Sequence, residues 1–487
     1  MRSLTTTDHE PAACRKVCAV MPTPPLLVAS ARRGRPCRTS PGTQSGDGVL
    51  KFSTWRVAAR CRLRAILVAV TMTTVAMTTV TMTTVALNAG YAAARPDSPL
   101  DLNAIADAAM RSVVADPDPF YAHTPPGADA RLGEILRIEP MAAPAVERTV
   151  PGVRGFRMLY VTTGPLGDRT AASASLFVPT ATPPHGMRAL IGMGVADESM
   201  GSYCRPTSSM SRNSVIDQVR GMGPVDSAST ALRAGHTVVV ADLADDGGPS
   251  PTPTLLPRFD GHALLDASRA ARSVPAAGLT ASSPIGIYGP SGGGSGAAAV
   301  AAEQAGTYAP ELHIPAIMIG QMVPDHRNFI RRNSGTVGAG FAVADLLGLE
   351  TGHPEMRIDD KLTAVGKRIA DAFRHACAVP TYLTLSYVPL PALFRPGHSP
   401  WADPDFRRAF DAAALATPTS PTPTARLRLT RCDSNLSPVS VTPVDDLARA
   451  AATYRAKGAR VTTRVVSCLG GPGDVYAPDL QWLLAAL

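Results

Sequence analysis

Short runs of apolar residues alternate with longer amphipathic stretches along most of the chain. Apolar runs of four or five residues, each typical of a buried strand, lie at 158–162, 174–178, 189–193, 237–241 and 285–288. Helix-like periodicity occupies 261–273 and 296–305. Strands that alternate with helices in this way indicate an α/β fold whose sheet is largely parallel. Residues 95–155 are rich in proline, and there we expect irregular chain apart from one helix near 102–114.

The alternation stops at about residue 326 and resumes near residue 421. The block between them is loop-rich and helical, most clearly at 359–376. It is followed by a strand at 427–429, a helix at 443–457, a strand at 460–466 and a last helix that ends at Leu487. We therefore expect one α/β core, formed by residues 95–325 and 421–487, which is interrupted by a helical cap at 326–420.

Composition and charge exclude two other classes of protein. Of the 487 residues, 45% are apolar and 18% are charged, so the chain has enough apolar residues to bury a core. The net charge of +8 is uneven, because residues 1–94 hold 12 Lys/Arg against 3 Asp/Glu and the remainder holds 35 against 36. The main part of the chain therefore lacks the basic surface that a nucleic-acid-binding protein needs.

Residues 56–94 have the features of a signal peptide. Four arginines between positions 56 and 64 precede a mostly apolar stretch at 65–87, and three alanines at 92–94 provide small residues for cleavage before Arg95. Eight threonines make the apolar stretch a poor membrane span, although an uncleaved anchor is the alternative. Residues 1–55 show neither a fold nor a signal pattern and remain unassigned. We expect the mature chain to be secreted or held at the cell envelope.

Four of the eight cysteines lie beyond this leader. They are far apart and form no CxxC motif, which argues against a zinc site and favours two disulfides in an oxidising compartment. Three pairings are open from spacing alone. The four residues are Cys204, Cys377, Cys432 and Cys468.

The residues at 289–293 read Gly-Pro-Ser-Gly-Gly and lie between an apolar strand and an alanine-rich helix. The pattern G-x-S-x-G in this context is typical of a nucleophile elbow. We expect Ser291 to adopt a positive φ and the N–H of Gly292 to face the oxyanion of an acyl-transfer intermediate. The alternative is a glycine-rich turn that only begins a helix. No metal motif or dinucleotide-binding loop is visible, so we expect no cofactor.

Several further segments are similar to the secretory lipases, an α/β-hydrolase family known from fungal lipase A and common in actinobacteria. They lie at 118–121, 133–137, 158–160, 178–179, 235–242, 261–267, 269–271 and 308–312. The resemblance covers nearly all of residues 116–487. It implies an α/β-hydrolase fold with a helical cap or lid, a lipid or acyl-ester substrate and transient contact with a lipid surface.

The resemblance also implies roles for particular residues. Glu198, with Asp197 beside it, takes the acidic position of the oxyanion loop, whose backbone N–H would be a second donor beside that of Gly292. Asp433 takes the position of the triad acid. The alternatives are solvated loop carboxylates for the first two residues and a solvated Asx turn for Asp433. The implied disulfides are Cys204–Cys377 and Cys432–Cys468.

The histidine of the triad is missing from its expected position. In the family it follows the strand at 460–466 and precedes the last helix, but residues 467–476 contain no histidine. The last histidine of the chain is His398, inside the expected cap. Removing one triad member typically leaves only ~10³–10⁴-fold acceleration over water.

Three functions therefore remain open. The first is a secreted carboxylic-ester hydrolase of lipase type, which acts on triacylglycerols or acyl esters in lipid catabolism through Ser291 with impaired turnover. The second is a non-catalytic lipase homologue that binds lipid at the cell envelope. The third is a peptidase or acyltransferase on the same fold, because a fold alone does not define a reaction.

Export should leave a mature chain without residues 1–94 and with both disulfides formed. The intact mass of the secreted protein should correspond to a start near Arg95, and thiol reagents should find no free cysteine under denaturing conditions. A full-length, thiol-reactive species outside the cell would contradict this prediction.

Overall fold

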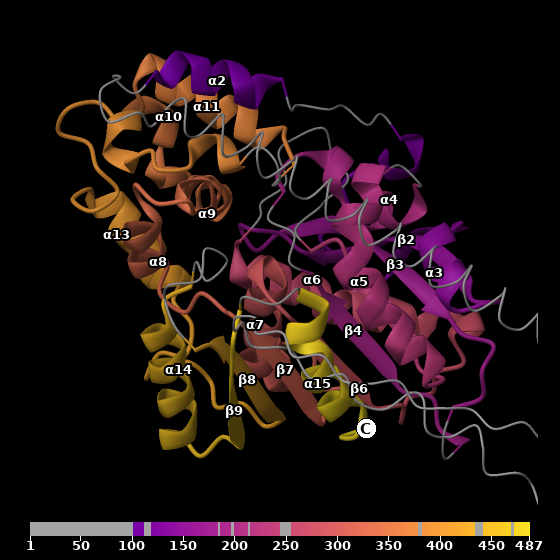
Figure 1. Ribbon diagram of the computed structural model, residues 1–487. Coiled ribbons are helices and arrows are strands. Elements are labelled where there is room, and N and C mark those ends of the chain that lie inside the picture. The colour runs from indigo at the N-terminus through magenta and orange to yellow at the C-terminus, as the bar shows by residue number, and fades with distance from the viewer. Residues whose placement is uncertain are drawn as a thin grey trace, which may run out of the picture. The chain divides into compact units, whose positions relative to one another are not determined.

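The computed structural model describes residues 101–111, 118–183, 186–195, 199–212, 215–243, 255–377, 382–433, 442–468 and 472–487 (Figure 1). All of these belong to a single compact unit. The expected signal peptide and the segment before it lie outside the described residues. None of the described helices is both long enough and apolar enough to cross a membrane.

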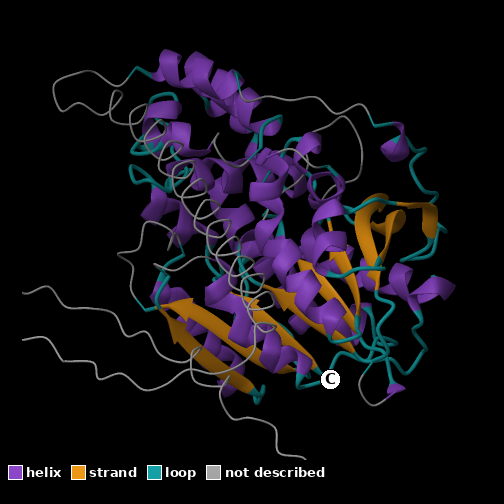
Figure 2. Ribbon diagram, turned by 45° about the vertical axis from the view of Figure 1, so that its right-hand side comes forward, coloured by secondary structure: helices purple, strands orange, loops and turns teal. Residues whose placement is uncertain are grey.

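The described residues form a nine-stranded sheet with the order β1-β2-β3-β5-β4-β6-β7-β8-β9. Figure 2 shows the strands in orange, with helices in purple packed around them. Strand β2 is antiparallel to its neighbours β1 and β3, and β3 is antiparallel to β5. All the remaining neighbouring pairs are parallel. The strands are β1 (Ile135–Pro140), β2 (Arg154–Thr163), β3 (Arg169–Val178), β4 (Leu190–Gly194), β5 (Thr237–Ala241), β6 (Ile285–Gly289), β7 (Ala316–Gly320), β8 (Arg426–Cys432) and β9 (Val461–Val466). The predicted α/β fold is confirmed.

Successive residues of a strand point to opposite sides, so a strand that is apolar throughout places apolar side chains on both faces of the sheet. Helices cover both of these faces. On β5, Val239 and Ala241 contribute to one apolar cluster, and Val238 and Val240 contribute to another. The first cluster includes α6 (Pro257–Ser273), α7 (Gly292–Tyr308) and α14 (Val444–Ala456). The second includes α3 (Pro144–Thr149), α5 (Val215–Arg233) and α15 (Pro472–Leu484).

The expectation of irregular chain at 95–155 was wrong for two elements, β1 and α3. β1 lies at the edge of the sheet and is only partly buried, so it needs no continuous apolar run. The pattern also gave no notice of β7, a five-residue strand that is fully buried. Parallel strands of this length lack the alternation that identifies a half-buried strand.

A helical insert, residues 326–413, lies between β7 and β8 (orange in Figure 1). Its helices are α8 (His326–Asn333), α9 (Ala339–Gly352), α10 (Ile358–Lys361), α11 (Ala364–Arg374) and α13 (Pro404–Ala413). They share an apolar core with α2 (Leu102–Met110), which lies across α11 at the top of Figure 1. The same core includes Met200, Leu256 and Phe259 from the α/β part, so the insert packs directly on it.

The single helix expected at 359–376 is two helices in the structure. Leu362 has extended backbone, and the Thr363 side chain accepts a hydrogen bond from the N–H of Gly366 at 3.0 Å, which begins α11 there. A threonine that caps a helix satisfies one of the N–H groups that the first turn leaves free. The helical periodicity on either side is continuous enough to conceal this break.

The first turn of α7 lies directly against the ends of two strands. A Cβ atom added to Gly294 would lie 2.5 Å from the carbonyl carbon of Gly194, at the end of β4. One added to Gly289, at the end of β6, would lie 2.2 Å from the carbonyl oxygen of Gly294. These contacts are between backbones, so neither can be relieved by moving a side chain. The glycines therefore determine how closely α7 approaches the sheet.

Replacing Gly294 with alanine should lower the stability of the fold, because the new methyl group would overlap the backbone of Gly194. A loss of about 1–3 kcal/mol is typical of overpacking. Gly306→Ala is the matched control in the same helix, because an added Cβ there meets nothing within 4 Å. That change should stabilise the protein by up to about 1 kcal/mol through helix propensity. Thermal unfolding of both variants measures the difference, and equal effects would contradict the proposed contact.

Candidate active site

Ser291 lies where the chain leaves β6 and begins α7. It is half-buried, and its backbone is extended, with φ −172° and ψ 175°. The left-handed conformation falls on the next residue, Gly292, with φ 50°. The expectation of a positive φ at Ser291 was therefore wrong. Glycine adopts this conformation without a Cβ clash, so the sharp turn is made one residue later.

The start of α7 presents backbone N–H groups beside this serine. The N–H of Gly294 donates to the carbonyl oxygen of Val195 at 3.0 Å, and that of Ser295 donates to the carbonyl oxygen of Ser291 at 3.0 Å. For the N–H of Gly292, the described part of the chain offers no hydrogen-bond partner. A free N–H at a helix N-terminus favours a negatively charged oxygen.

Asp433 follows β8, and its N–H donates to the carbonyl oxygen of Val466 at 2.7 Å, which extends the pairing with β9. Because β6 and β8 run parallel, Asp433 and Ser291 lie at the same carboxyl edge of the sheet. The Asp433 side chain is exposed, and no described residue donates a hydrogen bond to it. The other two predicted site residues, Asp197 and Glu198, lie outside the described residues.

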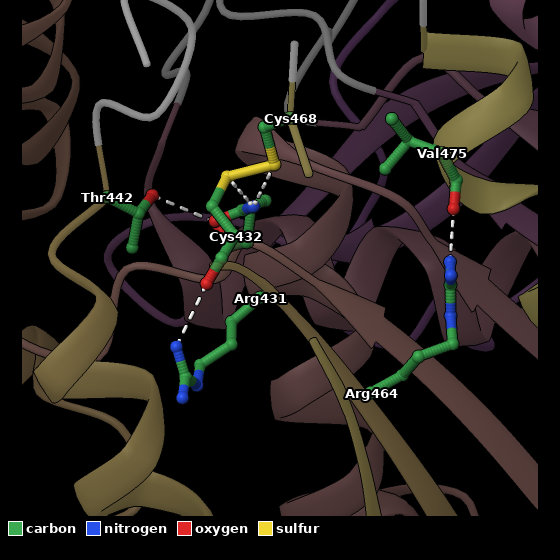
Figure 3. Close-up of a disulfide and its surroundings, with 7 residues drawn as sticks. Arg431, Cys432, Thr442, Arg464, Cys468 and Val475 are labelled. Atoms are coloured by element: carbon green, nitrogen blue, oxygen red, sulfur yellow. Dashed lines mark hydrogen bonds between the residues drawn. A yellow bond between two sulfur atoms is a disulfide. The ribbon is translucent and has the colours of Figure 1, made fainter. Parts of the chain in front are cut away.

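Both predicted disulfides, Cys204–Cys377 and Cys432–Cys468, are confirmed. Cys204 precedes α4 (Pro206–Ser211), whereas Cys377 follows α11, so the first bond connects the α/β part to the helical insert. The second bond joins Cys432, the last residue of β8, to Cys468, just beyond the end of β9 (Figure 3). This bond links the carboxyl ends of β8 and β9 to each other, next to Asp433.

Gln321 is a residue at this edge that the sequence analysis missed. It follows β7, is buried, and has a positive φ of 52°, which is costly for a residue with a Cβ. Its side-chain nitrogen Nε2 donates toward both sulfurs of the Cys432–Cys468 bond, and its backbone carbonyl oxygen accepts from the Thr442 hydroxyl at 3.1 Å (Figure 3). No local sequence signal distinguishes a glutamine in this conformation.

Tyr476, on the first turns of α15, is a described residue whose side chain interacts with the Ser291 hydroxyl. Tyr476 is buried, with 8% of its surface exposed. Burial raises the pKa of the Tyr476 phenol, and the nearby Tyr288 adds to this effect. The sequence analysis sought a histidine in this region and so passed over the tyrosine.

Histidines with described contacts are held elsewhere. In the helical insert, His326 Nδ1 lies 2.8 Å from Asp345 Oδ1, and both side chains are buried. On α6, His262 Nε2 lies 2.8 Å from Gln304 Oε1. Among the described residues, no histidine forms a hydrogen bond with Ser291. The same residues contain no group of three or more His, Cys, Asp or Glu that could hold a metal ion.

Comparison with known proteins identifies relatives of this chain. The model of the secretory lipase family matches residues 225–462. A secreted triacylglycerol lipase of Malassezia furfur is 30% identical over 53% of this chain. A Mycobacterium tuberculosis protein named as a probable inactive lipase is 30% identical over 50% of this chain. The predicted resemblance to the secretory lipases is confirmed. The chain spans about half the length of these relatives, 54% of each.

The fold also matches a solved structure, that of Candida antarctica lipase A in its closed state. The match has a TM-score of 0.67 and covers 76% of this chain and 85% of that one, at 20% sequence identity. At this identity the likeness concerns the fold. It confirms the α/β-hydrolase architecture that the elbow and the resemblance predicted.

The buried His262 should make the stability of the protein depend on pH. Burial lowers its pKa from 6.5 to about 4, and its ring stacks on Tyr308 with centroids 3.8 Å apart. Between these values the unfolded chain binds a proton that the folded chain does not, so stability is complete above pH 6.5 and falls as the pH approaches 4. The upper limit of this loss is roughly 3 kcal/mol.

The measurement is chemical denaturation of the wild type and of His262→Gln at several pH values. The substitution should flatten the dependence between pH 6.5 and about 4. An unchanged slope in the variant would show that other groups produce the pH dependence.

Proposed function

We propose that this relative of the secretory lipases is a secreted carboxylic-ester hydrolase of lipase type whose turnover is impaired. Its substrates would be triacylglycerols or shorter acyl esters, consumed in lipid catabolism. One observation carries the proposal: Ser291 lies at a strand-to-helix turn, beside the N–H of Gly292, for which the described residues offer no hydrogen-bond partner. A backbone donor for a negatively charged oxygen is thus adjacent to the serine hydroxyl.

The reaction would begin with attack of the Ser291 oxygen on the ester carbonyl carbon. The carbonyl oxygen becomes an oxyanion, to which Gly292 donates, and the serine proton must pass to a base. Collapse of the intermediate expels the alcohol, which takes up that proton, and water then hydrolyses the acyl-enzyme. The described part of the chain provides a nucleophile and an oxyanion donor, but no histidine to accept the proton.

The remaining roles belong to the same proposal. Asp197 and Glu198 would stand at the second oxyanion donor, and Asp433 would be the vestige of a triad acid. The helical insert would form a cap, since its apolar core continues into the α/β part through Leu256 and Phe259 and the Cys204–Cys377 bond connects the two. Such a cap would provide the apolar wall for an acyl chain and the transient contact with a lipid surface.

Secretion is supported by two observations. Relatives are named as secreted lipases. The two disulfides within the described residues fit an oxidising compartment. We therefore assign the mature chain to the extracellular space, with the cell envelope as the alternative location.

A second candidate is a lipase homologue that binds acyl chains without cleaving them. The absence of a histidine at 467–476 favours it, and so does the relative named as a probable inactive lipase. The two candidates differ in whether any ester turnover depends on Ser291.

Hydrolysis of p-nitrophenyl esters by the purified secreted chain should be slow, and Ser291→Ala should change the rate by less than about tenfold. Intact serine hydrolases lose far more, because their nucleophile acts together with a base. The assay compares wild type and Ser291→Ala at equal concentration, with unfolding curves to establish that both are folded. Fast hydrolysis by the natural chain that Ser291→Ala abolishes would show that another residue serves as the base.

A further inference from the structure

The ring of Tyr476 lies near the turn that carries Ser291. Its phenol interacts with the hydroxyl of Ser291, which opposes the effect of burial on the pKa of Tyr476. A Cβ added to Gly320, the last residue of β7, would lie 2.6 Å from Cε1 of Tyr476 and 2.4 Å from the carbonyl oxygen of Pro290. The ring and the elbow therefore meet over a glycine, and the absence of a side chain at position 320 makes room for both.

A buried ion-pair network fixes the helix that carries this tyrosine. Asp479, one turn after Tyr476 on α15, is fully buried, and its oxygens lie 2.7 Å and 2.6 Å from the Arg464 guanidinium on β9. The Thr430 hydroxyl donates to the same carboxylate at 2.8 Å. Arg464 also donates to the carbonyl oxygen of Val475, the residue before Tyr476 (Figure 3). A two-point contact of this kind defines orientation as well as distance.

The position of Tyr476 in the fold is the one from which a base would act. It follows β9 and lies on the first turns of the last helix, close to where the family has its histidine. A phenol there differs from an imidazole in one essential respect. Burial raises its pKa, so it stays protonated over the physiological range and does not take a proton from Ser291.

We propose that Tyr476 occupies the site of the missing base and holds the Ser291 hydroxyl in a hydrogen bond that restrains its attack on an ester. Tyr476 is thus a positioning residue, and this inference rests on the proposed assignment of Ser291 as the nucleophile. The bond between the two hydroxyls must be broken or shared when the serine oxygen attacks. Removing it should therefore accelerate the reaction of Ser291, whereas removing a catalytic hydroxyl would slow that reaction.

The test is covalent labelling of the full secreted chain with a fluorophosphonate, followed by mass spectrometry. The serine oxygen forms a bond to phosphorus, fluoride leaves, and the serine proton passes to solvent, or to a base where one exists. Tyr476→Phe keeps the ring against Gly320 and removes only the hydroxyl. Tyr454→Phe is the control. It likewise removes one buried phenol hydroxyl, which lies on α14 and is hydrogen-bonded to Glu303 at 2.8 Å.

Tyr476→Phe should label at Ser291 roughly two- to tenfold faster than the wild type, the range that the loss of one net hydrogen bond permits. Tyr454→Phe should label at the wild-type rate, and the wild type should show no titration step between about pH 5 and 8. Tyr476→His should label faster still, with a rise around pH 6 to 7 where an imidazole loses its proton. Its gain should disappear when Ser291→Ala is added.

Three results would overturn the role of Tyr476 while leaving Ser291 as the nucleophile. They are slower labelling of a folded Tyr476→Phe, a wild-type titration step between about pH 5 and 8, and a folded Tyr476→His that labels no faster than Tyr476→Phe. The first two do not require the histidine variant to fold. Label on a residue other than Ser291 would instead overturn the hydrolase proposal itself, and this inference with it.

Discussion

The contact between the backbones of α7 and the sheet is the constraint on which the rest of the site depends. Gly194 and Gly294 meet with no side chain between them, and Gly289 meets the carbonyl oxygen of Gly294. This approach sets the N-terminus of α7 at the carboxyl edge of the strands. The position of Ser291 and the direction of the Gly292 N–H both follow from it, because they are the residues that join β6 to the helix.

Covalent and polar contacts hold the carboxyl edge of the sheet around this turn. The Cys432–Cys468 bond joins the ends of β8 and β9, and Gln321 is held against its sulfurs in a strained conformation. Beyond it, Arg464 and Asp479 fasten α15 to β9. Strain of this kind persists only where the surroundings over-determine the backbone. The edge is therefore rigid on the side where a triad would have its acid and its base.

Rigidity and catalytic competence are separate properties in this molecule. In the proposed function, the features that would bind and orient an ester carbonyl depend on backbone geometry, and this geometry is present even though no described histidine is hydrogen-bonded to Ser291. Proton transfer depends on one side chain with a pKa near the working pH. The phenol at Tyr476 is well placed, but its pKa is raised by burial. A scaffold of this kind can retain the shape of a hydrolase after its base has been lost.

The sequence by itself determined the α/β order of elements, the turn that carries Ser291 and the missing histidine. These depend on local patterns: apolar runs, a glycine-flanked serine and the residue types at 467–476. Similarity to the secretory lipases also paired the four cysteines correctly, which spacing alone left open. The sequence analysis did not predict the edge strand β1, whose apolar pattern is weak, or the strand β7, whose apolar run is short.

Only the tertiary structure decided which residues meet at the site. The interaction between Ser291 and Tyr476 joins residues that are 185 positions apart in the sequence, and Gly320, on a third element, leaves room for the Tyr476 ring. The positive φ expected at Ser291 occurs at Gly292 instead, and Gln321 has a positive φ that is unfavourable for a residue with a Cβ. Each of these depends on the packing of several elements against one another. The local sequence pattern does not contain information on such contacts. It could therefore indicate Ser291 as the candidate nucleophile, but not the tyrosine that lies beside it.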